Sequence, residues 1–535
     1  MPPETLFRSI ARPVAELLFR SQHSRDDVLV GPIHGELLGA EHLAERARAV
    51  AHEQRLVLGE PRWQRAPLLG RLESTSHLLH EAHTRLSAAA DAGGDVGPAG
   101  DWFLDNFHVV QEHMREVRES LPRGYYRELP ELASGTLAGY PRIYELAITL
   151  IGHSEGRIDL ENVDLFVSAF QQVEPLNIGE LWATPAMLRL GLIENVRRMT
   201  LRTVQRLQEV ESADEWAVRL LEASEHGKGA LGAALAAFVA NHPTLTPIFV
   251  SRLLHQLRLT HGSFTPLVWL EQWIAEDGPS AEDAAIRSTQ RLAITQMMMA
   301  NSITSLRAIG RMEWRTFVER QSAMDAVLRE DPTGYYSLMT FATRDRYRHV
   351  VERIAKRTGR AETAVAREAV DLARAGAERG TPPGEPPTDA RYTHVGYYLV
   401  DDGLALLEQA TRYRPGPRDS IYRWMRRHAN VVLVGGIVAG TAAALAILFW
   451  LGGADARAAW LVVVLVAFIP ANDIAVAVVN QLITTFLPPR TLPKLDLRQV
   501  GGVPAEYRTA VVIPTLFGSV GITTAVRYSA GTPPA

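Results

Sequence analysis

Apolar residues recur at helical spacing over most of the chain before residue 428. The clearest pattern has spacings of 4-3-4-3-4, and Asp101 opens its helix while Pro122 ends it. Its apolar face consists of Phe103, Phe107, Val110, Met114, Val117 and Leu121. Long runs of alternating apolar and polar residues are absent from the sequence, so an extended sheet is not expected. The pattern therefore predicts a mainly α fold.

Several residues mark where helices begin. Asp159 can cap a helix whose apolar residues run to Phe170, and Pro141 suits the first turn of the preceding helix. Thr246 followed by Pro247 is typical of a helix start. Further helices are predicted over residues 41–58, 68–90, 187–208, 214–223, 230–240, 281–301, 302–328 and 340–358.

Two apolar runs near the C-terminus, 431–451 and 458–479, each approach the roughly 20 residues that a membrane-spanning helix needs. Basic residues flank the pair on its outer sides: Arg418, Arg423, Arg426, Arg427, Arg490, Lys494 and Arg498. The connection 452–457 holds only Arg457 beside Asp455. Because basic residues collect on the cytoplasmic side, we predict a two-helix transmembrane hairpin with both ends in the cytoplasm. A buried helical hairpin in a soluble protein is the alternative.

Breaks in the helical pattern divide the chain into predicted segments. A Gly- and Ala-rich loop at 91–100 separates an N-terminal helical segment, 1–90, from a helical domain, 101–375. The Pro/Gly-rich stretch 376–390 is predicted to be an exposed linker. A juxtamembrane segment, 391–428, then leads to the first apolar run.

The composition excludes several classes of function. The 535 residues carry a formal net charge of -4 and no basic stripe, so nucleic acid is not an expected partner. There is no cysteine, which excludes disulfides, thiolate metal sites and a cysteine nucleophile and suits a cytoplasmic domain. The first residues have no apolar core of signal-peptide length, so the polar part of the chain is expected to stay in the cytoplasm.

A series of stretches resembles the region that precedes the glucosyltransferase domain in cyclic β-1,2-glucan synthases, which are large bacterial inner-membrane enzymes. One is Ile178-Gly-Glu-Leu-Trp-Ala-Thr-Pro-Ala-Met-Leu, and the others are residues 31–43, 101–107, 121–130, 341–348 and 394–399. The resemblance covers roughly residues 25 to 518 in order, and such a series is more specific than any one short motif.

The resemblance implies a multi-pass protein of the bacterial inner (cytoplasmic) membrane. In the complete family enzyme a transferase domain that uses UDP-glucose and a divalent cation follows the hairpin. Residues 507–517 resemble the first strand of that domain, and the sequence departs from the family pattern from about Gly521. We therefore expect 505–535 to be a short β stub, the truncated or frame-shifted start of the transferase domain. The expected partners are the lipid bilayer and either the remaining synthase domains or a second copy of the chain.

The sequence lacks the residues that sugar-nucleotide transfer needs. A metal-dependent transferase requires a carboxylate pair for the cation, and no Asp-x-Asp occurs here. The Gln-x-x-Arg-Trp motif of processive transferases and Gly-rich phosphate loops are also missing. We therefore predict no catalytic, cofactor-binding or metal-binding residue in this chain, and no glucose transfer by the chain alone.

One polar site is expected inside the second apolar run, where Asn472 and Asp473 follow Pro470. A carboxylate at membrane depth is costly and usually faces protein or a wet cavity. The two residues could line an exit path for glucan in an intact synthase. The alternative is a helix break near the membrane surface with Asp473 in water.

Other candidate residues have a structural alternative. His77, His80 and His83 could present imidazoles to a metal, but a solvated helix face is the simpler interpretation. Asp101 and Asp105 could serve glycoside hydrolysis, but capping and interaction with the helix dipole are the simpler interpretation. Aromatic residues could stack on sugar rings or belong to the core. They are Trp102, Tyr125, Tyr126, Trp182, Trp269, Trp273, Tyr335 and Tyr336, of which the first four are the preferred carbohydrate contacts.

The sequence thus favours an anchoring and scaffolding part of a synthase. A free-standing membrane-tethered interaction protein is one alternative. An independent glycosidase built on helical hairpins is another, and it would need two acids that face each other across a cleft.

Overall fold

The computed structural model describes residues 33, 35–57, 66–241, 244–259, 267–277, 280–378, 390–451, 460–486, 492–497 and 502. These residues are mostly helical, and the only β pairing among them consists of isolated bridges. The predicted mainly α fold is therefore confirmed. The predicted β stub 505–535, most of the predicted linker and the connection 452–457 lie outside the described residues.

The chain divides into two compact units, Met1–Ala326 and Val327–Ala535. The division lies inside the segment predicted as one helical domain, 101–375. The predicted domain boundaries stay a prediction, and each unit is described by itself below.

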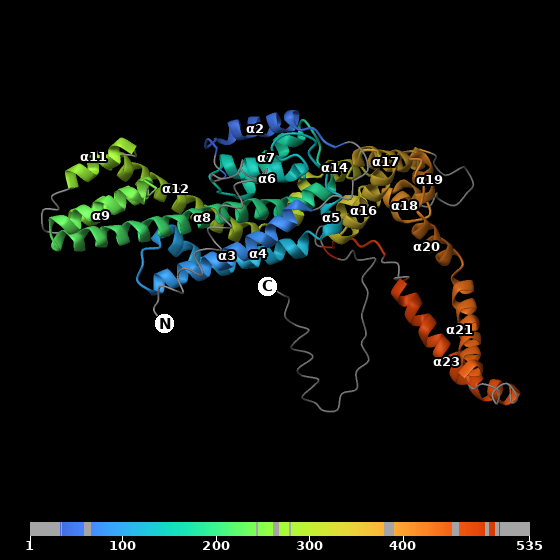
Figure 1. The fold of residues 1–535 in the computed structure, drawn as a ribbon. Coiled ribbons are helices and arrows are strands. Elements are labelled where there is room, and N and C mark those ends of the chain that lie inside the picture. Colours follow the sequence, from blue (N-terminus) through green and yellow to red (C-terminus); the bar gives the residue numbers. More distant parts are fainter. Residues whose placement is uncertain are drawn as a thin grey trace, which may run out of the picture. The chain divides into compact units, whose positions relative to one another are not determined.

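The first unit is built from helices of very different length (Figure 1). They are α2 (Ala40–Glu53), α3 (Pro67–Asp91), α4 (Gly97–Ser120), α5 (Arg123–Tyr126), α6 (Arg142–His153), α7 (Leu160–Gln171), α8 (Ile178–Glu225), α9 (Lys228–Ala240), α10 (Pro247–Leu259), α11 (Leu267–Asp277), α12 (Ala281–Arg311), α13 (Trp314–Gln321) and α14 (Ala323–Leu328), whose last residues enter the second unit.

Helix α8 is the axis of this unit, because α3, α4, α6, α10 and α12 all pack against it (Figure 1). It is 48 residues long and begins with a capping box, in which the Asn177 side chain accepts from the Glu180 amide and the Glu180 carboxylate accepts from the Asn177 amide. The prediction of separate helices over 187–208 and 214–223 is wrong. Pro185 lies inside α8, beyond its first turn, and lacks the amide that would donate to the carbonyl four residues earlier.

The predicted helix starts are partly confirmed. Asp159 caps α7 in a capping box with Asn162, and the Thr246 hydroxyl accepts from the Phe249 amide at 3.2 Å. Pro141 is the N-cap of α6 and not a residue of its first turn. Helix α4 begins at Gly97, so Asp101 lies in its second turn and is not the capping residue that the sequence predicted. The loop before α4 is correspondingly shorter than predicted.

Close packing of α6 on α8 depends on one glycine. A Cβ at Gly191 would stand 2.5 Å from Ile151 Cδ1 and 3.2 Å from Ile148 Cδ1. A larger residue at this position would force the ends of both isoleucine side chains to move, so the glycine allows α6 and α8 to pack closely here.

A second core cluster joins the C-terminal half of α8 to α9, α10 and α11. Phe238 lies at its centre, fully buried, with edge-on contacts to Trp216 at 5.2 Å and Trp273 at 5.7 Å between ring centroids. Trp273, one of the candidate sugar-stacking residues, is therefore partly buried and packs against this cluster.

The second unit contains short helices and two long apolar ones. They are α15 (Tyr335–Leu338), α16 (Phe341–Thr358), α17 (Glu362–Glu378), the 3-10 helix η3 (Ala390–Thr393), α18 (Val395–Val400), α19 (Leu404–Ala410), α20 (Pro417–Arg427), α21 (Ala429–Leu451) and α23 (Trp460–Phe486). Helices α16, α17, α18 and α19 pack around a core that includes Tyr347 and Tyr398. Helix α17 continues to Glu378, so the first residues of the predicted linker are helical.

The two apolar helices α21 and α23 pack against each other, and each is long and apolar enough to cross a membrane (Figure 1). Small residues line their contact: a Cβ at Gly440 would stand 3.1 Å from the Cβ of Ala475. Their outer side chains are uncovered by the described chain, with Trp450 82% and Leu465 80% exposed. This exposure argues against the alternative of a hairpin buried in a soluble protein.

After α23 the chain pairs with the backbone that precedes α16. Met339 and Leu495 form an isolated antiparallel bridge, the Thr340 amide donates to the Lys494 carbonyl at 2.9 Å, and the Asp496 amide donates to the Leu338 carbonyl at 2.8 Å. These bonds tie the segment 492–497 to the helical part of the same unit.

Candidate functional site

The predicted polar site of the second apolar run lies partly at the contact between α21 and α23. Asn472 Oδ1 accepts from Thr441 Oγ1 at 3.4 Å, and the Thr441 hydroxyl also donates to the Ile437 carbonyl at 2.8 Å. Thr441 is buried, whereas Asp473 is exposed on the outer side of the pair. Asn472 therefore links α23 to α21 through a hydrogen bond, whereas the exposed Asp473 side chain faces the surroundings of the helix pair. The predicted role of both residues in a glucan path stays a prediction.

The four preferred carbohydrate contacts come from two separate places. Trp102 is 39% exposed near the start of α4. Tyr125 and Tyr126 belong to α5, and Trp182 lies half-buried near the start of α8, where the Tyr125 hydroxyl donates to the Gly179 carbonyl at 2.5 Å. About 27 Å of helix separates Trp102 from the end of α4, after which α5 begins.

Burial limits what these tyrosines can contact. Tyr126 is 2% exposed, and burial raises the pKa of its phenol. Tyr336 is fully buried, whereas Trp269 and Tyr335 are 47% and 52% exposed. The described aromatic residues are thus distributed over core and surface and do not gather into one groove. Sugar stacking stays a prediction for the exposed ones.

The histidines of α3 contact neighbouring side chains. His80 Nδ1 is 2.7 Å from the Ser76 carbonyl oxygen and its Nε2 is 2.8 Å from Gln111 Nε2. His83 stacks on Phe107 with ring centroids 4.5 Å apart, and burial followed by the charge of His80 lowers its pKa. No group of three His, Asp or Glu residues suited to a metal ion occurs in the described part of the chain.

The acidic pair Asp101 and Asp105 lies exposed on α4, one helical turn apart. A glycosidase needs two carboxyl groups on opposite sides of the scissile bond. Neither residue lines the cavities found in the described part of the structure.

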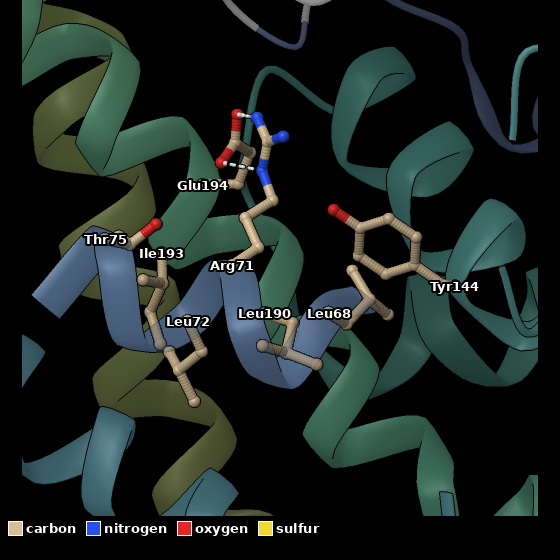
Figure 2. A pocket seen from close by; sticks show the side chains of 8 residues that line it. All are labelled: Leu68, Arg71, Leu72, Thr75, Tyr144, Leu190, Ile193 and Glu194. Atoms are coloured by element: carbon tan, nitrogen blue, oxygen red, sulfur yellow. Dashed lines mark hydrogen bonds and ion pairs between the residues drawn. The ribbon is translucent and has the colours of Figure 1, made fainter. Parts of the chain in front are cut away.

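A buried charge cluster in the first unit was not predicted from the sequence. The Glu194 carboxylate on α8 accepts two hydrogen bonds from Arg71 of α3, at 2.9 and 3.1 Å, as Figure 2 shows. It accepts two more from Arg197, at 2.7 and 2.9 Å, and one from Arg198 at 2.8 Å. Burial alone would raise the pKa of the Glu194 carboxyl, but the hydrogen bonds from Arg197 and Arg71 outweigh it and hold that pKa well below its ordinary value.

The cavity beside this cluster is too small for a substrate. Its volume is about 10 Å³, room for one water molecule, and its lining residues are Leu68, Arg71, Leu72, Thr75, Tyr144, Leu190, Ile193 and Glu194 (Figure 2). The Glu194 cluster therefore links α3 to α8 and has a structural role.

A similar pair, Arg142 and Glu180, links α6 to the start of α8 through hydrogen bonds of 2.5 and 2.8 Å.

A larger cleft, about 320 Å³ in volume, lies where α8, α10 and α12 meet the start of α4. Arg202, Arg206 and Glu209 of α8 line it together with Arg291 of α12 and Gly97 of α4. The sequence shows these arginines at ordinary helical spacing, so only the packing of four helices reveals that they converge.

No family model matches the chain. Over 438 residues, 80% of its length, the chain is 32% identical to the cyclic beta-(1,2)-glucan synthase NdvB of Rhizobium meliloti (strain 1021). This chain is related to a cyclic beta-(1,2)-glucan synthase. The predicted resemblance is confirmed, and the chain spans 15% of the length of that relative.

Proposed function

We propose that this chain anchors and scaffolds a cyclic beta-(1,2)-glucan synthase-like glucosyltransferase at the bacterial inner membrane. The relationship to the glucan synthase supports the class of enzyme. The anchoring role rests on the uncovered apolar surface of α21 and α23, because a protein in water rarely leaves so continuous an apolar surface exposed.

The proposed topology places both ends of the hairpin on the same side of the membrane. Helix α20 leads directly into α21, and the segment 492–497 after α23 is hydrogen-bonded to residues 338–340 of the same unit. Basic residues precede the first span and follow the second, which favours the cytoplasm for this side. The lipid bilayer is then the first partner of the chain.

We assign the chemistry of glucosyl transfer to other parts of an intact synthase. The chain has no Asp-x-Asp pair to hold a divalent cation against UDP-glucose. The helical units would bring those other domains, or a second copy of this chain, to the membrane surface. This scaffolding role predicts that membranes containing only this chain incorporate no labelled glucose from UDP-glucose, and incorporation would refute it.

Cysteine labelling tests the anchor and its orientation, because the natural chain contains no cysteine. Three single variants, Ser420→Cys, Ala456→Cys and Thr491→Cys, place a thiol before, between and after the two apolar helices. In intact spheroplasts a membrane-impermeant maleimide should label only the Ala456→Cys variant. In inverted vesicles it should label the other two.

Three outcomes of these experiments would contradict the proposed anchor or its topology. Labelling of all three variants in spheroplasts, or recovery of the chain in the soluble fraction after alkaline carbonate extraction, would contradict the anchor. Labelling of the Ser420→Cys and Thr491→Cys variants on opposite sides would contradict the proposed topology alone.

A further inference from the structure

The 320 Å³ cleft of the first unit has the dimensions of a small-molecule site. Ligand pockets usually enclose about 300–1,000 Å³, so this cleft fits a small solute and not a polysaccharide. It is formed by α8, α10, α12 and the start of α4, all within one compact unit.

Two of the three arginines in the cleft lack a counter-charge. Arg206 donates to the Asp95 carboxylate at 2.6 Å and to the Asp95 carbonyl at 3.0 Å. The side chains of Arg202 and Arg291 make no hydrogen bond or ion pair within the described part of the chain. Burial, followed by the positive charge of Arg291, lowers the pKa of the Arg202 guanidinium. The fold therefore brings the half-buried guanidinium of Arg202 near that of Arg291, which is exposed, and neither is paired with a carboxylate of the described chain.

One carboxylate also lines the cleft. Glu209 Oε1 accepts from Gln205 Nε2 at 2.9 Å, and its Oε2 is buried without a hydrogen-bond partner among the described residues. Since Asp95 balances Arg206, the remaining charges are two guanidinium groups against one carboxylate. The cleft keeps a net positive charge.

The start of α4 adds to this charge. Val96, Gly97 and Ala99 line the cleft, and Gly97 is the first residue of a 24-residue helix. The N-terminus of a long helix carries a partial positive charge and favours anions. Asp95 Oδ1 accepts from the Gly97 amide at 2.9 Å and offsets part of this charge, so the two arginines carry the main part of the argument.

We propose that the cleft binds a small, soluble phosphate monoester through Arg202 and Arg291. Two planar guanidinium groups match the charge and the oxygen geometry of a phosphate dianion. Binding would supply the counter-charge that the two arginines lack. The proposal concerns the first unit alone and does not depend on the anchoring function.

Calorimetric titration of the full chain in detergent, with inorganic phosphate and with glycerol 3-phosphate as probes, tests the proposal. Sodium chloride at matched ionic strength corrects for non-specific screening. Glycerol 3-phosphate should bind with a Kd below about 1 mM. Arg202→Gln and Arg291→Gln should each weaken binding at least about tenfold, as expected for loss of a charged hydrogen-bonding partner.

Arg115→Gln is a matched control, because Arg115 is exposed on α4, about 27 Å along the helix from Gly97. It removes the same charge and should leave the affinity unchanged. Without ligand, Arg202→Gln should raise the Tm, since it relieves the repulsion from Arg291, and added phosphate should stabilise the natural chain more than the variant. Absence of binding, or equal weakening by all three variants, would overturn the proposal.

Discussion

The buried Glu194 cluster gives the sharpest stability prediction. Glu194→Gln removes the one negative charge that Arg71, Arg197 and Arg198 share, while it keeps a side chain of the same size. The side chains of Arg71 and Arg197 are 19% and 16% exposed and can turn partly toward water. The Arg198 side chain is only 5% exposed, so its guanidinium cannot turn toward water.

The expected cost of Glu194→Gln is about 3–5 kcal/mol of unfolding free energy, the usual effect of leaving a buried charge without its partner. Adding Arg198→Gln to the same variant should recover part of this loss, because it removes the least exposed of the three guanidinium charges. Denaturant unfolding followed by circular dichroism measures both changes. Glu119→Gln is the matched control, because Glu119 belongs to an exposed pair with Arg115 and should cost less than about 1 kcal/mol.

The same variant should change the dependence of stability on pH. The pKa of Glu194 in the folded chain lies below the ordinary value of 4.5, so its contribution is complete above pH 4.5 and is lost as the pH falls further. The natural chain should therefore lose stability more steeply than Glu194→Gln below pH 4.5. Equal slopes, or a loss under about 0.5 kcal/mol at pH 7, would refute the assignment of a stabilising buried charge cluster.

Three further predictions concern a helix cap, a histidine and the hairpin. Asp159→Ala should cost about 1 kcal/mol in denaturant unfolding, because it removes the N-cap of α7, and an unchanged midpoint would contradict the capping box. Hydrogen bonding to Asp345 raises the pKa of His349 to about 10, so His349→Gln should destabilise the chain most below pH 6.5 and by steadily less toward pH 10; a constant difference over that range would be inconsistent with this. Gly440→Leu should separate α21 from α23 and lower the Tm in detergent, whereas Val434→Leu, on the exposed side of α21, should leave it unchanged; equal Tm values for the two would count against the Ala475 contact.

The parts of the fold that depend on local signals could be predicted from the sequence. The Asp159 cap and the Thr246-Pro247 helix start depend on residues no more than three apart, and each apolar run is one continuous stretch of chain. Asn177 followed three residues later by Glu180 was also a readable capping box.

The parts that depend on packing between distant segments could not be predicted. Glu194, Arg197 and Arg198 have the i, i+3 and i, i+4 spacing of an ordinary surface ion pair, and Arg71 of α3, which completes the buried cluster, lies 123 residues earlier in the chain. The convergence of Arg202 and Arg291 likewise needs α8 and α12 side by side. The burial of aromatic residues could not be predicted either: Trp182 and Tyr336 were both candidate sugar-stacking residues, yet Trp182 is half-buried and Tyr336 is fully buried.

The backbone bonds between residues 338–340 and 494–496 have a mechanical consequence. They join the backbone just before α16 to the backbone after α23, so the two ends of the intervening segment, which contains the apolar hairpin, are held together. A force applied to the chain beyond residue 497 therefore acts first on these hydrogen bonds. Helix α23 bears the force only after they break.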